Sequence, residues 1–155
     1  MNDVKRCEML FKQLVDVITS VYGNEVTSNE DLIQIGRDVF KSLSNHVVRN
    51  ADYDFKRMNG KYGIINIDNG PGIHWCSTFQ RGRVITVFDS FDRRIERLMA
   101  DFCTRAKREG YIVKQTKDKN HRREQRDEQS DCGQRCIAWL ILSKAMGVEF
   151  ASLIL

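Results

Sequence analysis

One segment, residues 132–146, most restricts how this chain can fold. Its centre, Cys136–Leu142, is apolar on every side at helical spacing. A helix without a polar face has to be surrounded by other elements rather than lie at the surface. Gly147 follows directly and is suited to end such a helix. We therefore predict a long helix over 132–146 that is central and buried.

The remaining pattern mixes helices and strands without a repeating order. Apolar residues recur at helical spacing over 4–22 and 91–109, and Thr27 with Glu30 forms a capping box for a helix that begins near Ser28. Short strands are indicated at 62–68, 74–79, 84–88 and 111–113, separated by turn residues. This order predicts an α+β fold, formed by a single domain over residues 1–155.

Composition and cysteine count restrict the class of protein. The chain has 155 residues, of which 41% are hydrophobic and 30% charged, so it is too apolar to be disordered. No apolar run is long enough to cross a bilayer, and the polar N-terminus is not a secretory signal. Five cysteines, an odd number, then favour a reducing compartment and free thiols: Cys7, Cys76, Cys103, Cys132 and Cys136.

The hairpin over 74–88 brings a histidine and a carboxylate together. If the turn is centred on Arg81 and Gly82, His74 lies directly opposite Asp89, on the same face of the sheet. A carboxylate there would fix the imidazole tautomer and stabilise the imidazolium, as the orienting pair of a catalytic triad does. The alternative is an ordinary surface pair. Asp92 is a second carboxylate, which its place at a helix entrance explains equally well.

Cys132 stands where a thiol becomes reactive. It opens the apolar helix just after Ser130 and Asp131, which are good N-cap residues. The positive end of the helix dipole lowers a thiol pKa and favours the thiolate. Gly133 is expected to leave one flank open for a substrate. The alternative is a buried structural cysteine, which fits Cys136 and the other three better than Cys132.

A metal site is the other use of these residue types. His74 and Cys76 share a strand face, and with Cys132 and Cys136 they offer four ligands that suit zinc. Their spacings are not those of a common zinc module. We expect no metal and no other cofactor.

Three motifs together resemble a known family. The first is Gly63–Trp75, which ends in the pair His74-Trp75. The second is Phe88-Asp89-Ser90-Phe91 within Val87–Phe91, and the third is Asp131-Cys132-Gly133 within Gln129–Cys136. In this order they resemble the adenain and Ulp1-like cysteine proteases, above all the small proteases of adenoviruses and of virophage-like and Polinton-type DNA elements. The resemblance covers roughly residues 27–146. It implies a papain-like fold, with a central buried helix packed on a small mixed or antiparallel sheet. Trp75 resembles the family tryptophan beside the active site, and simple core packing explains it equally well.

The resemblance also assigns catalytic roles. Cys132 would be the nucleophile, His74 the general base and Asp89 the residue that orients it. A glutamine ahead of the cysteine would stabilise the oxyanion together with the backbone N–H of Cys132. Gln125 has the seven-residue spacing of the adenovirus type, and Gln129, three residues before the cysteine, is the second candidate.

The activity that the resemblance implies is peptide hydrolysis. The expected protein is a cysteine endopeptidase that cleaves viral or capsid precursor proteins after a small residue, often glycine. It would act in the virion and in the nucleus or cytoplasm of the host cell. Two alternatives stay open: an isopeptidase for SUMO-type modifiers, and an inactive protease-fold module that binds DNA or protein.

A basic segment suggests a further partner. Residues 114–127 carry a net charge of +3, most of the chain's +4. The adenovirus enzyme that the chain resembles is a DNA-assisted protease, so Lys117, Lys119, Arg122 and Arg123 are candidate DNA contacts. A solvated loop is the alternative. That enzyme also uses a peptide cofactor attached through a cysteine, but helix packing explains Cys103 equally well, and no peptide cofactor is expected.

Overall fold

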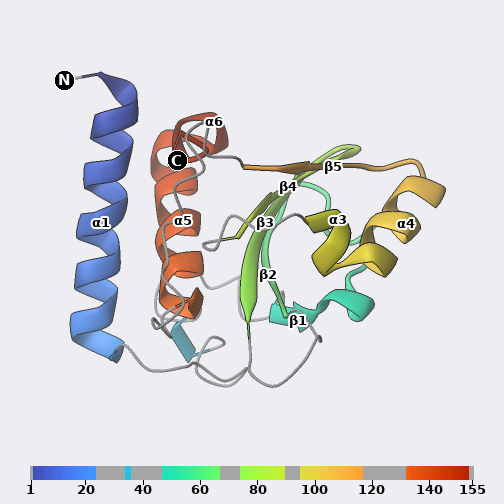
Figure 1. Ribbon diagram of the computed structural model, residues 1–155, viewed down its shortest axis with the longest axis horizontal. Coiled ribbons are helices and arrows are strands. Elements are labelled where there is room, and N and C mark those ends of the chain that lie inside the picture. The colour runs from blue at the N-terminus through green and yellow to red at the C-terminus, as the bar shows by residue number, and fades with distance from the viewer. Residues whose placement is uncertain are drawn as a thin grey trace.

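A five-stranded mixed sheet forms the middle of the molecule (Figure 1). Its strands are β1 (Val47–Arg49), β2 (Tyr62–Asn66), β3 (Trp75–Arg81), β4 (Val84–Phe88) and β5 (Ile112–Gln115), and they lie side by side in chain order. The middle three form an antiparallel meander, whereas β1 and β5 run parallel to their neighbours. The structure is a computed structural model that describes residues 2–23, 34–35, 47–66, 74–89, 95–116 and 132–153.

Helices cover both faces of this sheet. They are α1 (Asp3–Tyr22), the 3₁₀ turn η2 (Asn50–Asp52), α3 (Ile95–Leu98), α4 (Ala100–Arg108), α5 (Cys132–Met146) and α6 (Val148–Ala151). Helix α5 lies between α1 and the sheet, and α3 and α4 lie on the opposite side of the sheet (Figure 1). The α+β class predicted from the sequence is confirmed.

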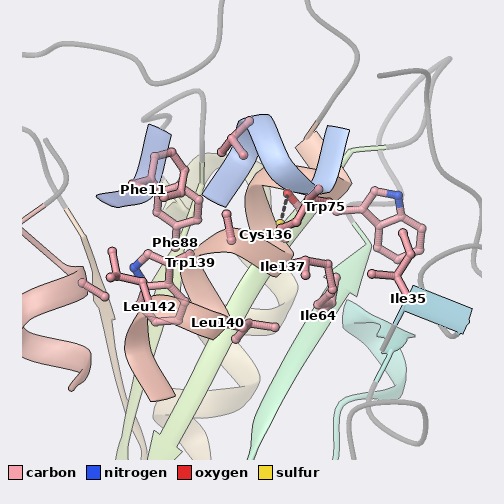
Figure 2. Packing of buried hydrophobic residues seen from close by; sticks show 14 of the residues in the cluster. Phe11, Ile35, Ile64, Trp75, Phe88, Cys136, Ile137, Trp139, Leu140 and Leu142 are labelled. Atoms are coloured by element: carbon pink, nitrogen blue, oxygen red, sulfur yellow. Dashed lines mark hydrogen bonds between the residues drawn. The ribbon is translucent and has the colours of Figure 1, made fainter. Parts of the chain in front are cut away.

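Strand alternation divides the interior into two cores. Ile64, Trp75 and Phe88 point to the face that α5 and α1 cover, where Phe88 stacks on Trp139 with ring centroids 5.7 Å apart (Figure 2). Their chain neighbours Ile65 and Val87 point to the other face and pack against α3 and α4. Because side chains alternate along a strand, both faces of β2, β3 and β4 are buried.

The central helix matches its prediction. Helix α5 spans Cys132–Met146, and residues 136–140 of its apolar centre have no exposed surface. Gly147 follows with a φ of +94°, a left-handed backbone conformation that glycine adopts without strain. The helix is therefore the element around which α1, α6 and β3 pack.

Several elements differ from expectation. The helix expected over 91–109 is divided into α3 and α4 at Met99, whose backbone (φ −133°, ψ 58°) is not helical. Strand β1, η2 and α6 were not anticipated. Of the helix expected from residue 28, only the helical pair 34–35 lies within the described residues. Across the described part of the chain, every helix is too short or too polar to span a membrane.

Candidate active site

The β3–β4 hairpin differs from its predicted register by two residues. Arg81 pairs with Val84, so the two loop residues are Gly82 and Arg83, and Gly82 has a φ of +59°. Asp89, one residue beyond the pair Ser77–Phe88, therefore lies opposite Cys76 rather than opposite His74. The predicted direct pairing is wrong because the turn was placed one residue too early. A shift of two residues nevertheless preserves the face, since side chains alternate with a period of two.

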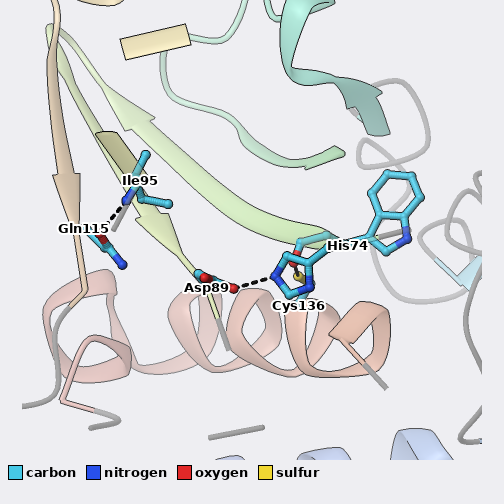
Figure 3. A network of polar contacts seen from close by, with 6 residues as sticks. His74, Asp89, Ile95, Gln115 and Cys136 are labelled. Carbon is cyan, nitrogen blue, oxygen red and sulfur yellow. Dashed lines mark hydrogen bonds and ion pairs between the residues drawn. The ribbon is translucent and has the colours of Figure 1, made fainter. Parts of the chain in front are cut away.

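His74 and Asp89 meet despite this correction. The Nε2 atom of His74 lies 2.5 Å from Oδ1 of Asp89 (Figure 3). The Asp89 side chain has no exposed surface, and that of His74 is 12% exposed. An ionised carboxylate can only accept a hydrogen bond, so Nε2 carries the proton that Asp89 accepts. In neutral His74 this leaves Nδ1 as the basic nitrogen, and Asp89 stabilises the charge when the ring is protonated.

Helix α5 is joined to the start of β3 by two hydrogen bonds. The Cys136 thiol donates to the carbonyl oxygen of Trp75 at 3.2 Å, and the Ser77 hydroxyl donates to the Cys136 carbonyl at 3.2 Å. Trp75 directly follows His74 in the chain. Cys132, the first residue of α5, is one helical turn before Cys136, a rise of about 6 Å. The beginning of α5 is therefore fixed next to the strand end that carries the histidine. The side chain of Cys132 lies outside the described residues.

Two expected substrate-binding residues are buried. Trp75 has no exposed surface and belongs to the core on the α5 side of the sheet, as in the core-packing alternative. Gly133 is also buried, whereas an open flank was expected there. Trp75 is the first residue of β3 and Gly133 lies in the first turn of α5, and neither is exposed at the surface of the described structure.

Several other predicted site residues lie outside the described residues. They are the oxyanion candidates Gln125 and Gln129, the alternative carboxylate Asp92, and the basic residues Lys117, Lys119, Arg122 and Arg123. Within the described part of the basic segment, Lys114 on β5 is exposed.

The remaining cysteines divide into buried and partly buried thiols. Cys7, Cys76 and Cys136 are buried, and Cys103 on α4 is partly exposed. Burial raises the pKa of the Cys103 thiol to about 11, and the Glu96 carboxylate adds to the shift. Cys103 is therefore a weak nucleophile at neutral pH.

Cys76 adds a third functional group to the histidine and carboxylate. His74, Cys76 and Asp89 each offer one ligand atom, and these atoms all lie within 4.8 Å of one another. His74 and Cys76 were expected on one strand face, but the position of Asp89 opposite Cys76 was not predicted. A turn placed at Gly82 and Arg83 would have predicted it.

Comparison with known proteins identified no relative of this chain. No family model, curated protein or solved structure matches the chain.

Proposed function

We propose that the protein is a cysteine endopeptidase in which Cys132 attacks a peptide carbonyl and His74 acts as the base. The observation that carries this proposal is the His74–Asp89 pair at 2.5 Å, because a buried carboxylate that fixes a histidine tautomer is what a base of this kind requires. The start of α5 beside that histidine's strand supports Cys132 as its partner.

The proposed reaction is acyl transfer in two stages. The Cys132 thiol gives its proton to Nδ1 of His74, and the thiolate bonds to the carbonyl carbon of the substrate. His74 then returns the proton to the leaving amine, and water releases the acyl group from the sulfur. Asp89 supports both proton transfers because it stabilises the imidazolium that forms between them.

We further propose the papain-like fold of the Ulp1 and adenain type, and viral precursor proteins with a small residue before the scissile bond as substrates. A helix that begins at a cysteine and packs on a mixed sheet supports this fold. The substrate class rests on the motif resemblance alone. For the isopeptidase and the inactive module, the described residues supply no separate support.

The test is covalent labelling with a Gly-Gly peptide that carries a thiol-reactive group, read by intact mass and peptide mapping. We expect one adduct, on Cys132, and a large loss of rate in His74→Ala. Cys132→Ala should give no adduct, and Cys103→Ser should label like the unmodified chain because its thiol is weakly ionised. Slow labelling of several cysteines that does not depend on His74 would overturn the proposal.

A further inference from the structure

The thiol of Cys76 has no role in the proposed reaction, yet it lies beside both residues that do. His74 directly precedes β3, Cys76 is its second residue, and Asp89 directly follows β4. The register of the hairpin brings all three residues to the same end of the sheet, where one ligand atom from each lies within 4.8 Å of the other two. We call these residues the strand-end cluster.

The chemistry of the strand-end cluster is that of a transition-metal site. Imidazole nitrogen, thiolate sulfur and carboxylate oxygen are the three ligand types that zinc takes in proteins. A thiolate and an imidazole also select against Mg²⁺ and Ca²⁺, which prefer oxygen ligands. We propose that His74, Cys76 and Asp89 bind a zinc ion, and that this ion reversibly inhibits the protease by occupying its base.

The distances suit such an ion with small side-chain movements. Zinc binds sulfur at about 2.3 Å and nitrogen or oxygen at about 2.0–2.2 Å, so tetrahedral ligand atoms lie roughly 3.3–3.7 Å apart. One ligand atom from each residue lies within 4.8 Å of the other two, and Nε2 of His74 is 2.5 Å from Oδ1 of Asp89. Separations between ligand atoms therefore need to close by about 1 Å at most, and the Nε2–Oδ1 separation opens by about 1 Å as the ion replaces the shared proton.

Charge and burial also favour occupation. Asp89 and Cys76 are buried, while His74 is partly exposed and gives access from solvent. A carboxylate and a thiolate together carry two negative charges, which a divalent ion neutralises, so the buried site becomes uncharged overall. Water completes the four-coordinate shell.

Binding moves two protons. The Cys76 thiol loses its proton to solvent, since only the thiolate is a ligand. In neutral His74 the ring proton passes from Nε2 to Nδ1, because Nε2 now bonds the metal. A ring with a proton on Nδ1 and zinc on Nε2 cannot accept a proton from Cys132. This inhibition, unlike the metal site itself, rests on the proposed function.

The test is a titration of the reduced, metal-free protein with Co²⁺, using a reductant that is not a thiol. We expect one equivalent to bind, with a thiolate-to-cobalt charge-transfer band and the visible bands of four-coordinate Co²⁺. Zn²⁺ should displace Co²⁺ and so remove both the charge-transfer band and the visible bands. Cys76→Ala should abolish the charge-transfer band, while Cys103→Ser and Cys132→Ala should retain it. A band that survives in Cys76→Ala, or that disappears in Cys132→Ala, would overturn the assignment.

Two further measurements guard against variants that fail to fold. Asp89→Asn keeps the side-chain volume and should weaken Co²⁺ binding by more than the roughly 10–100-fold typical of outer-shell partners. In the unmodified chain, Zn²⁺ should shift the ¹⁵N resonance of Nε2 in His74 and leave the other two histidines, His46 and His121, unchanged. Equal shifts in all three would show binding elsewhere and refute the site.

Activity separates this inference from the proposed function. If Zn²⁺ stops labelling of Cys132 and a chelator restores it, both stand. A Cys76-dependent cobalt spectrum without any labelling of Cys132 would support the metal site and refute the protease. Labelling of Cys132 without a Cys76-dependent cobalt spectrum would support the protease and refute the metal site.

Discussion

The carboxylate of Asp89 offers the most direct test of the proposed base. Asp89→Asn removes one negative charge and keeps the size of the side chain, so the core around it is preserved. The interaction at stake is that between the carboxylate and the imidazolium, whose nearest atoms are 2.5 Å apart. Two unit charges centred about 4 Å apart interact by about 4 kcal/mol at an effective dielectric constant of 20.

That energy sets the expected loss of rate. About 1.4 kcal/mol corresponds to a factor of ten, so removal of the charge should reduce the thiolate–imidazolium population, and with it the labelling rate of Cys132, by about 10³-fold. The assay is the second-order rate constant with the Gly-Gly reagent at saturating reductant. Circular dichroism melts confirm that the variant is folded.

Two control variants are compared with Asp89→Asn. His74→Ala gives the rate without a base, and Asp101→Asn makes the same charge change at an exposed position on α4. We expect Asp101→Asn to match the unmodified chain within about twofold, because exposed charges contribute little. A folded Asp89→Asn protein that loses less than about tenfold would show that the carboxylate does not support the base, and the reasoning from the 2.5 Å contact would be wrong.

If Gln125 is the oxyanion donor, Gln125→Ala should slow labelling of Cys132 by about 10²–10³-fold, and Gln129→Ala should change the rate little. The opposite result would identify Gln129 as the oxyanion donor. Trp139→Ala, which empties a site without exposed surface, should lower the free energy of unfolding by about 3–5 kcal/mol in urea titrations. Gly82→Ala should cost about 1 kcal/mol in the same assay, since a φ of +59° strains any side chain although no atom would contact the added Cβ. Cys103 should be alkylated about 100-fold more slowly at pH 8 than a free thiol, with the rate rising up to a midpoint near pH 11; a midpoint near pH 9 would contradict the burial of this group.

The elements that local patterns define were predictable from the sequence. The apolar run of α5 and the two strands of the β3–β4 hairpin carry their own signals, and α5 and β4 begin and end where expected. Within the helical spacing predicted over 91–109, Ile95, Met99, Phe102 and Ala106 are all buried, although the backbone departs from helix at Met99. Periodicity reports which residues are buried, and it does not detect a local break in the helix.

The elements that depend on distant partners were not predictable. Strand β1 has three residues and exists by pairing with β2, which a local pattern does not reveal. The His74–Asp89 contact was predicted from the wrong register and survives because the error was an even number of residues. Trp75 was assigned equally to the active site and the core, and only its packing against α5 distinguishes these.

The pairing of the first helix with the last has a consequence for biosynthesis. The Cys7 thiol on α1 donates to the carbonyl of Phe150 at 3.0 Å, across a sequence separation of 143 residues, and α1 packs on α5 and α6. Closing so large a loop is slow, and it requires that α5 has already left the ribosome. During translation α1 therefore lacks α5 and α6, the helices it packs against in the described part of the chain, until late, and the same late helix α5 carries the proposed nucleophile. A nascent chain would acquire its main core and its proposed nucleophile in one step, only after α5 has been made.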